Sequence, residues 1–114
     1  MPDRKELGRA AEDQAADFLL GQGYTIVTRR FKGQNGEADV VCLHGEVLVF
    51  VEVKLKTAKD YVPEEAIGEA KLNALQRVAQ EYVRKFEVKR DFRFDVIAID
   101  RSGLRHHIDI LGNR

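Results

Sequence analysis

Two short segments of the sequence place acidic side chains among valines. They are Gly36-Glu37-Ala38-Asp39-Val40-Val41 and Val49-Phe50-Val51-Glu52-Val53-Lys54. A solvated strand would usually alternate charged residues with threonine, whereas Glu52 has a valine on each side. The pattern therefore favours a set of Asp39, Glu52 and Lys54 within a sheet. The alternative is a solvated strand face that carries an ordinary salt bridge.

A hairpin at His44 and Gly45 would pair these two segments as antiparallel strands. A two-residue loop at this point pairs Leu43 with Glu46, Asp39 with Phe50 and Glu37 with Glu52. Because side chains alternate between the two faces of a sheet, this register predicts one polar and one apolar face. The polar face would carry Glu37, Asp39, Phe50, Glu52 and Lys54. The apolar face would carry Ala38, Val40, Cys42, Val49, Val51 and Val53.

Three carboxylates and an ammonium on one sheet face suggest a particular chemistry. Carboxylates that lie together repel each other and raise one another's pKa, and a divalent cation relieves this repulsion. Oxygen ligands suit Mg²⁺ or Mn²⁺, which activate water and neutralise charge on a phosphodiester. Lys54, two residues after Glu52, would orient that water or stabilise the pentacovalent phosphate. These parts are the ones that hydrolytic phosphodiester cleavage requires.

The rest of the chain predicts the elements that must position this set. Apolar periodicity and turn residues predict helices over 3–20 and 63–86, and strands over 24–30, 37–43, 46–55, 91–100 and 104–111. Short connections make the first three strands an antiparallel meander, and the long second helix permits a parallel fourth strand. We expect one domain over 1–114, of class α/β and order αβββαββ, with a mixed central sheet flanked by helices.

The order of Asp39 and Glu52-Val53-Lys54, with twelve residues between them, resembles the PD-(D/E)xK nuclease signature. The αβββαβ core of that superfamily lies within the predicted element order. Several longer segments are similar to the YraN family of small bacterial proteins, which themselves resemble Holliday-junction resolvases. They are Gly8-Arg9-Ala10-Ala11-Glu12, Ala15-Ala16-Asp17-Phe18-Leu19, Gly23-Tyr24, Gly36-Glu37-Ala38-Asp39, Phe50-Val51-Glu52-Val53-Lys54 and Arg93-Phe94-Asp95-Val96-Ile97. The resemblance covers the chain from Gly8 to about Ile110.

This resemblance implies a restriction-endonuclease-like fold and a metal-dependent endonuclease acting on DNA, including branched or structured DNA. It assigns Asp39 and Glu52 as ligands of Mg²⁺ or Mn²⁺, Lys54 as the catalytic lysine, and Glu12 as a further acidic member of the site. DNA rather than RNA would be the partner, and by analogy with resolvases the protein would form a homodimer. Two departures are Lys56, where the family often has arginine, and Ala38, where it has a larger aliphatic residue.

Basic residues near the proposed site along the chain are candidate phosphate contacts. They are Arg29, Arg30, Lys32, Lys56 and Lys71. Lys71 lies near the centre of the apolar stripe of the second helix, so it either points into the site or extends along apolar surface to solvent. Glu12 lies at the border of the first helix stripe, where a metal ligand and a plain surface carboxylate are equally compatible with the pattern.

Other residues with reactive side chains are expected to be structural. Cys42 is predicted to be an inert core thiol, His44 a turn residue, and Asp95 a support for the sheet or for a neighbouring basic group. His106 and His107 should face opposite sides of a strand, which argues against a shared metal. The segment Thr57–Val62 is predicted to be a loop beside the site.

The overall composition limits the classes of function. The 114 residues carry 19 Lys and Arg against 19 Asp and Glu, so the net charge of zero excludes a histone-like polycation. The single cysteine fits a reducing compartment, and neither a secretory signal nor an apolar run of roughly 20 residues is visible. We therefore expect a cytoplasmic protein with no membrane partner. Two alternatives to a nuclease remain, a catalytically silent nucleic-acid-binding module of the same fold and an interaction scaffold.

Overall fold

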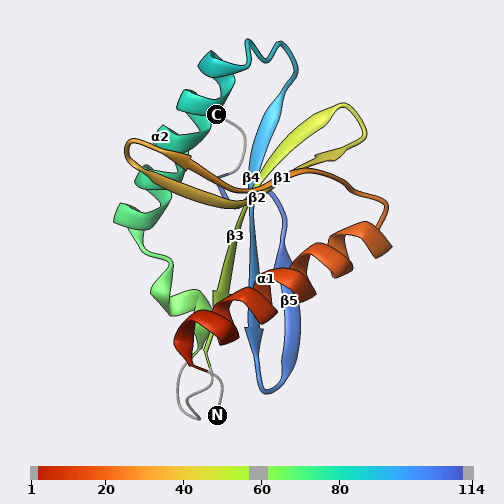
Figure 1. The fold of residues 1–114 in the computed structure, drawn as a ribbon, viewed down its shortest axis with the longest axis vertical. Helices are drawn as coiled ribbons and strands as arrows, with labels where there is room; N and C mark the ends of the chain where they lie inside the picture. Colours follow the sequence, from red (N-terminus) through yellow and green to blue (C-terminus); the bar gives the residue numbers. More distant parts are fainter. Residues whose placement is uncertain (1–2, 57–61, 112–114) are drawn as a thin grey trace.

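The computed structural model describes residues 3–56 and 62–111 (Figure 1). Its elements are α1 (Arg4–Gly21), β1 (Thr25–Gly33), β2 (Gly36–His44), β3 (Val47–Leu55), the 3-10 helix η1 (Pro63–Ala66), α2 (Glu69–Lys85), β4 (Phe92–Asp100) and β5 (Gly103–His107). The α/β class and the αβββαββ order are confirmed. Most of the predicted Thr57–Val62 loop, residues 57–61, lies outside the described residues.

The five strands form a mixed sheet in the order β1-β2-β3-β4-β5. The first three strands pair antiparallel and β3 and β4 pair parallel, as predicted, and β5 is an antiparallel edge strand. This arrangement is consistent with a restriction-endonuclease-like fold. The last strand ends at His107 and not at Leu111, because Asp109 adopts a left-handed backbone with φ of 57° that turns the chain out of the ladder.

Helix α1 covers one face of the sheet. Asp3 caps it by accepting a hydrogen bond from the Glu6 backbone N–H at 2.8 Å. Its small buried residues allow close approach to the strands, where they join a core with side chains of β2, β3 and β4. The helix contributes Ala11, Ala15 and Leu19, and the strands contribute Val40, Cys42, Val49, Val51, Ile97 and Ile99.

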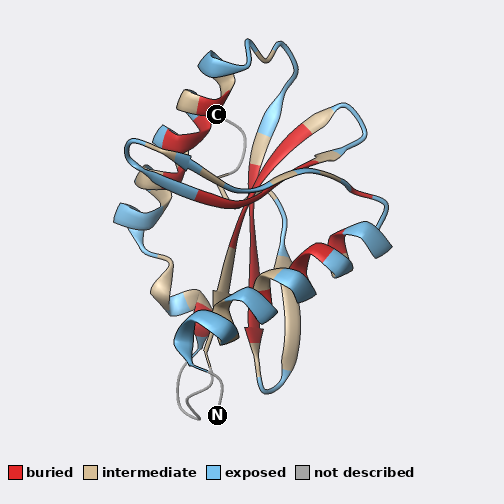
Figure 2. Ribbon diagram, viewed as in Figure 1, coloured by how far each residue is buried: buried red, intermediate tan, exposed pale blue. Residues whose placement is uncertain are grey.

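Helix α2 covers the other face, so the central strands are buried on both sides (Figure 2). Its buried residues are Leu75, Val78, Ala79 and Tyr82, which pack with Ala38, Val41, Leu48, Phe50 and Phe94. The predicted helix over 63–86 is wrong in one respect, because it is split into η1 and α2. Gly68 is extended between them and begins α2 as its N-cap, and glycine is a poor helix former. Neither helix of the described chain is long and apolar enough to cross a membrane.

The β2–β3 hairpin has a different loop from the predicted one. His44 pairs with Val47, so the two loop residues are Gly45 and Glu46, and the predicted pairs of β2 with β3 are displaced by two residues. Gly45 has φ of 60°, a conformation that two-residue hairpins require and that glycine adopts without strain. The predicted pairing of Asp39 with Phe50 is therefore wrong, and Phe50 is buried in the core under α2.

The regular alternation of side chains breaks at Arg30 and Asp39, which lie between the β1–β2 pairs Arg29↔Val40 and Phe31↔Ala38. Val40 joins the core under α1, whereas Ala38 joins the core under α2, so the predicted single apolar face is wrong at this position. Arg30 has a left-handed backbone with φ of 56°, which rotates the strand there. Beyond this point the β1–β2 hairpin crosses over α2 (Figure 1).

The carboxylate of Glu81 on α2 holds the tip of that hairpin. It accepts hydrogen bonds from the Gln34 backbone N–H at 2.7 Å and from Asn35 Nδ2 at 2.8 Å. The turn residues are Gly33-Gln34-Asn35-Gly36, and Gly33 pairs with Gly36. The hairpin is therefore anchored on α2, which leaves β2 and β3 to separate below it.

Candidate active site

The site lies where β2 and β3 part. Their register pairs extend from His44↔Val47 only as far as Val40↔Val51. At the next position a side chain takes the place of the backbone as hydrogen-bond acceptor. Asp39 Oδ2 accepts a hydrogen bond from the Val53 N–H at 2.8 Å. Asp39 is held at the fork between the two strands and is only 8% exposed.

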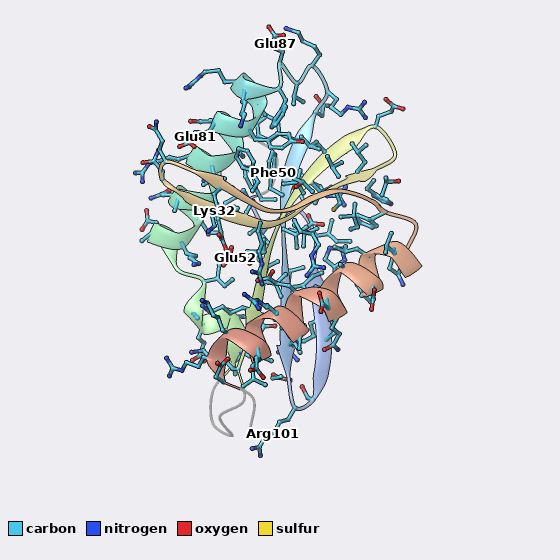
Figure 3. The ribbon with its side chains drawn as sticks, viewed as in Figure 1. Lys32, Phe50, Glu52, Glu81, Glu87 and Arg101 are labelled. Carbon is cyan, nitrogen blue, oxygen red and sulfur yellow. The ribbon has the colours of Figure 1, made fainter. Side chains whose placement is uncertain are left out.

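Glu52 lies on the β3 side of this fork and is equally buried. It faces α2, where Lys71 in the first turn of the helix places its Nζ 3.4 Å from Glu52 Oε1. Figure 3 shows Glu52 in the region between the two helices. Lys71 therefore points into the site, and this resolves the alternative that it merely extends along apolar surface.

The positive charge near the two buried carboxylates does not offset the effect of their burial. Burial and the charge of Glu52 raise the pKa of Asp39 to about 7, more than the Val53 hydrogen bond lowers it. Burial also raises the pKa of Glu52, although Lys71 and Lys54 act in the opposite direction. The fold thus holds two acids in an environment that disfavours their charged forms.

Glu12 reaches the site from α1. Its side chain is 14% exposed and accepts a hydrogen bond from Arg30 Nε at 2.7 Å, with Arg29 Nη2 at 4.0 Å. Its charge also contributes to the raised pKa of Asp39. Glu37, on the exposed part of β2, contributes to the raised pKa of both Asp39 and Glu52. Glu12 is thus a partly buried acid that pairs with Arg30 and whose charge acts on Asp39.

Lys54 is half-buried near the end of β3, and its charge lowers the pKa of Glu52. Among residues 3–56 and 62–111, no acidic side chain forms an ion pair with it. A groove of about 480 Å³ runs beside it, between the start of α1 and the end of β3. Its lining residues are Arg4, Leu7, Gly8, Val53, Lys54, Leu55 and Lys56.

The predicted phosphate contacts fall into two groups. Arg29, Arg30 and Lys71 hold acidic side chains, since Arg29 Nη2 lies 2.7 Å from Asp13 Oδ1 and the other two hold Glu12 and Glu52. Lys32 is exposed on β1 opposite Glu37, and Lys56 lies just beyond β3, where its N–H donates to the Ile99 carbonyl. Arginine side chains predicted to be available for phosphate thus already have partners.

The donor set suits a hard divalent cation. In the described parts of the chain, no three His, Cys, Asp or Glu side chains converge closely enough to form a complete metal cage. Mg²⁺ in proteins is usually bound by one or two carboxylates and several waters, so Asp39 and Glu52 fit this mode. A bound cation would favour the charged forms of both carboxyls, which burial disfavours.

A second polar cluster lies elsewhere in the sheet, under α1. Asp95 is fully buried and accepts hydrogen bonds from Arg93 Nε at 3.1 Å and the Asp109 N–H at 2.9 Å, and it pairs with His106 Nε2 at 2.8 Å. These partners outweigh burial and lower its pKa. Asp95 supports the sheet and its basic neighbours, as predicted.

The remaining predictions on reactive side chains have mixed outcomes. Cys42 is a buried thiol whose pKa burial raises to about 12, as expected for an inert core residue. His107 pairs with Glu64, away from the Asp95 partner of His106, so the two histidines do face opposite sides. The prediction for His44 is wrong, because it ends β2 and stacks on Tyr24. The predicted register placed His44 in the hairpin loop, whereas the structure pairs it with Val47.

Comparison with known proteins places the chain in a family. The sequence model of the family described as "Uncharacterised protein family UPF0102" matches residues 11–99. The chain belongs to this family. The UPF0102 protein of Syntrophotalea carbinolica is 42% identical over 102 residues, covering 88% of this chain and 83% of the relative. That of Caldicellulosiruptor saccharolyticus is 36% identical over 110 residues, covering 95% and 93%.

The UPF0102 match spans the whole site. Glu12 on α1, Asp39 and Glu52 at the fork, Lys54 on β3 and Lys71 on α2 all fall within residues 11–99. The resemblance to YraN-like proteins seen in the sequence is confirmed at the level of the family. The names of these relatives give the family and no reaction.

Proposed function

We propose that this UPF0102 protein is a metal-dependent endonuclease that hydrolyses phosphodiester bonds in DNA, with branched or otherwise structured DNA as its substrate. The single observation that carries the proposal is the fork at Asp39. There the fold buries two carboxylates together, raises the pKa of both, and places Lys54 on the same strand as one of them. Strongly perturbed carboxylates near a lysine are typical of catalytic sites.

In this proposal Asp39 and Glu52 would hold Mg²⁺ or Mn²⁺, and Glu12 would complete or support the site from α1. When bound, such an ion lowers the pKa of a water ligand and offsets the negative charge that develops on phosphorus. The Val53 N–H fixes the Asp39 carboxylate through Oδ2, so this group is oriented before any ligand arrives.

Lys54 would provide the positive charge that acts on the attacking water and on the phosphate. Its ammonium lies close enough to Glu52 to lower the pKa of that carboxyl, so it is near the place where the scissile phosphate would bind. From there it would orient the attacking water and stabilise the oxyanion of the pentacovalent phosphate. Lys32 and Lys56 would hold neighbouring phosphates as point charges.

Cleavage assays on single-stranded, duplex and four-way-junction DNA test this proposal. We expect cleavage in Mg²⁺ or Mn²⁺, and we expect Lys54→Met and Asp39→Asn each to reduce it by about 100-fold or more. Lys85→Met is the matched control, since Lys85 is an exposed lysine at the far end of α2, over the rings of Phe31 and Phe86. Cleavage that persists unchanged in Lys54→Met or Asp39→Asn would overturn the assignment.

A second candidate is a catalytically silent nucleic-acid-binding module of the same fold. The ion pairs of Glu12 with Arg30 and of Glu52 with Lys71 favour it, because the protein's own cations partly neutralise the acidic cluster. This candidate predicts DNA binding that weakens with salt and no cleavage with any divalent ion. For either candidate we propose a cytoplasmic homodimer as the working form, to be checked by fractionation and by light scattering.

A further inference from the structure

Two acids of the candidate site are each held by a cation from a different element. Lys71 on α2 holds Glu52 at 3.4 Å, and Arg30 on β1 holds Glu12 at 2.7 Å. In both pairs the acid is fixed and the cation is accessible. The side chains of Glu52 and Glu12 are 10% and 14% exposed, whereas those of Lys71 and Arg30 are 48% and 39% exposed.

The backbone at Arg30 shows how that contact is made. Successive side chains of a strand point to opposite faces, yet Arg29 and Arg30 both reach acids of α1, Asp13 and Glu12. The left-handed φ of 56° at Arg30 makes this possible, and a non-glycine residue adopts it only at a cost in energy. Arg30 lies between the pairs Arg29↔Val40 and Phe31↔Ala38 of the β1–β2 ladder, as Asp39 does on β2. The strain therefore places a guanidinium between α1 and the fork.

We infer that Lys71 and Arg30 are exchangeable counterions, which hold Glu52 and Glu12 in the ion-free protein and transfer to DNA phosphates when a divalent ion binds the carboxylates. This inference rests on the proposed function and adds a binding order to it. An ion held by these carboxylates would repel both side chains, and the side chains of Lys71 and Arg30 are exposed enough to move into solvent. Once released, they add two positive charges to the face that meets the DNA backbone.

The exchange makes ion and DNA binding cooperative. A first ligand that displaces Lys71 from Glu52 leaves the ammonium free for the second, and thermodynamic linkage makes the effect equal in both directions. The Arg93–Asp95 pair shows the contrasting design, with its side chains 17% and 0% exposed. Asp95 in this pair is fully buried, so a competing ion from solvent has far less access to it than to Glu52 or Glu12.

The test measures binding and needs no turnover. The affinity of the whole protein for a short fluorescein-labelled DNA duplex is measured by anisotropy with and without Ca²⁺, an oxygen-seeking ion, while gels confirm that the DNA stays intact. The affinity for Ca²⁺ alone is measured by calorimetry. We expect Ca²⁺ to strengthen DNA binding of the wild type by about tenfold.

Lys71→Met removes the charge and keeps the length of the side chain. We expect it to bind Ca²⁺ about three- to tenfold more tightly without DNA, and to lose most of the coupling between Ca²⁺ and DNA. Arg30→Met should act in the same direction, and Lys85→Met should behave as wild type. A Lys71→Met protein that binds Ca²⁺ no more tightly and keeps the full coupling overturns the inference alone. Wild type that binds no Ca²⁺ overturns the proposed function as well.

Discussion

Asp39 on β2 and Asp95 on β4 are buried carboxylates that flank β3 from its two sides. Asp95 is the more deeply buried, yet its pKa is lowered, whereas the pKa of Asp39 is raised to about 7. Asp95 has a guanidinium, an imidazole and a backbone N–H as partners, and Asp39 has a backbone N–H and three other acids nearby. Burial alone thus does not distinguish a structural acid from a candidate catalytic one, and the balance of local charge does.

The largest expected loss of stability comes from removing Asp95, the acid whose charge is compensated by Arg93 and His106. Asp95→Ala leaves Arg93 and His106 buried beside an apolar methyl group, with the Asp109 N–H also unpaired. Breaking a buried ion pair in this way costs about 3–5 kcal/mol. Urea unfolding should show this loss, or a protein that no longer unfolds cooperatively. Asp95→Asn, which keeps the acceptor oxygen, should lose less. A loss below about 1 kcal/mol for Asp95→Ala would mean that the network contributes little.

Neutralising Asp39, which has no cation as a partner in the described part of the chain, should stabilise the protein, whereas removing Asp95 should destabilise it. The folded protein holds the Asp39 proton up to about pH 7, whereas the unfolded chain releases it at an ordinary aspartate pKa. Stability is therefore lost as pH rises between the two pKa values. Asp39→Asn keeps an acceptor for the Val53 N–H and removes this loss. We expect a gain on the order of 2 kcal/mol near pH 8, roughly 8 °C in Tm, and a smaller gain near pH 5.

Thermal unfolding across pH and with Mn²⁺ checks this prediction. Mn²⁺ should raise the Tm of the wild type at pH 8, because the ion supplies the missing positive charge, and should raise that of Asp39→Asn much less. Asp95→Asn is the control for charge alone, and it should lower the Tm at the same pH. An Asp39→Asn protein that is less stable than wild type at pH 8 would show that the fork is a structural feature.

The sequence predicts the element order and the acidic cluster for one physical reason. Valines beside Glu52 imply burial, and a buried strand next to short turns permits few topologies. The same argument brings Asp39 and Glu52 together, whereas the helical pattern leaves the position of Lys71 open and the structure places it beside Glu52. The prediction fails where local geometry decides, because the loop begins at Gly45 and moves the β2–β3 register by two residues. A displacement of two does not exchange the two faces of β3, so Glu52 and Lys54 stay on the face predicted for them.

Two other features carry no usable signal in the sequence. Arg30 has a left-handed backbone although arginine rarely adopts one, and this separates Ala38 and Val40 into different cores. The pairing of arginines with acids of α1 depends on that same rotation. By contrast, the prediction that Asp95 supports the sheet or a neighbouring basic group is confirmed, because Arg93 lies two residues earlier on the same strand face and pairs with it.

The smallest expected change in stability concerns His44 and Tyr24, which contact Arg93 at the edge of the Asp95 cluster. His44 stacks on Tyr24 with ring centroids 4.3 Å apart and planes 6° from parallel, and its Nδ1 lies 3.4 Å from Arg93 Nη1. Arg93 keeps Asp95 and the Tyr24 hydroxyl when His44 is removed, so His44→Ala should cost less than about 1 kcal/mol in urea unfolding. Tyr24→Phe keeps the stack and removes the hydroxyl that accepts from Arg93 at 2.8 Å. Because Arg93 is the partner of the buried acid, Tyr24→Phe should cost more than His44→Ala, and the reverse order would locate the stabilisation in the stacked rings instead of in charge compensation.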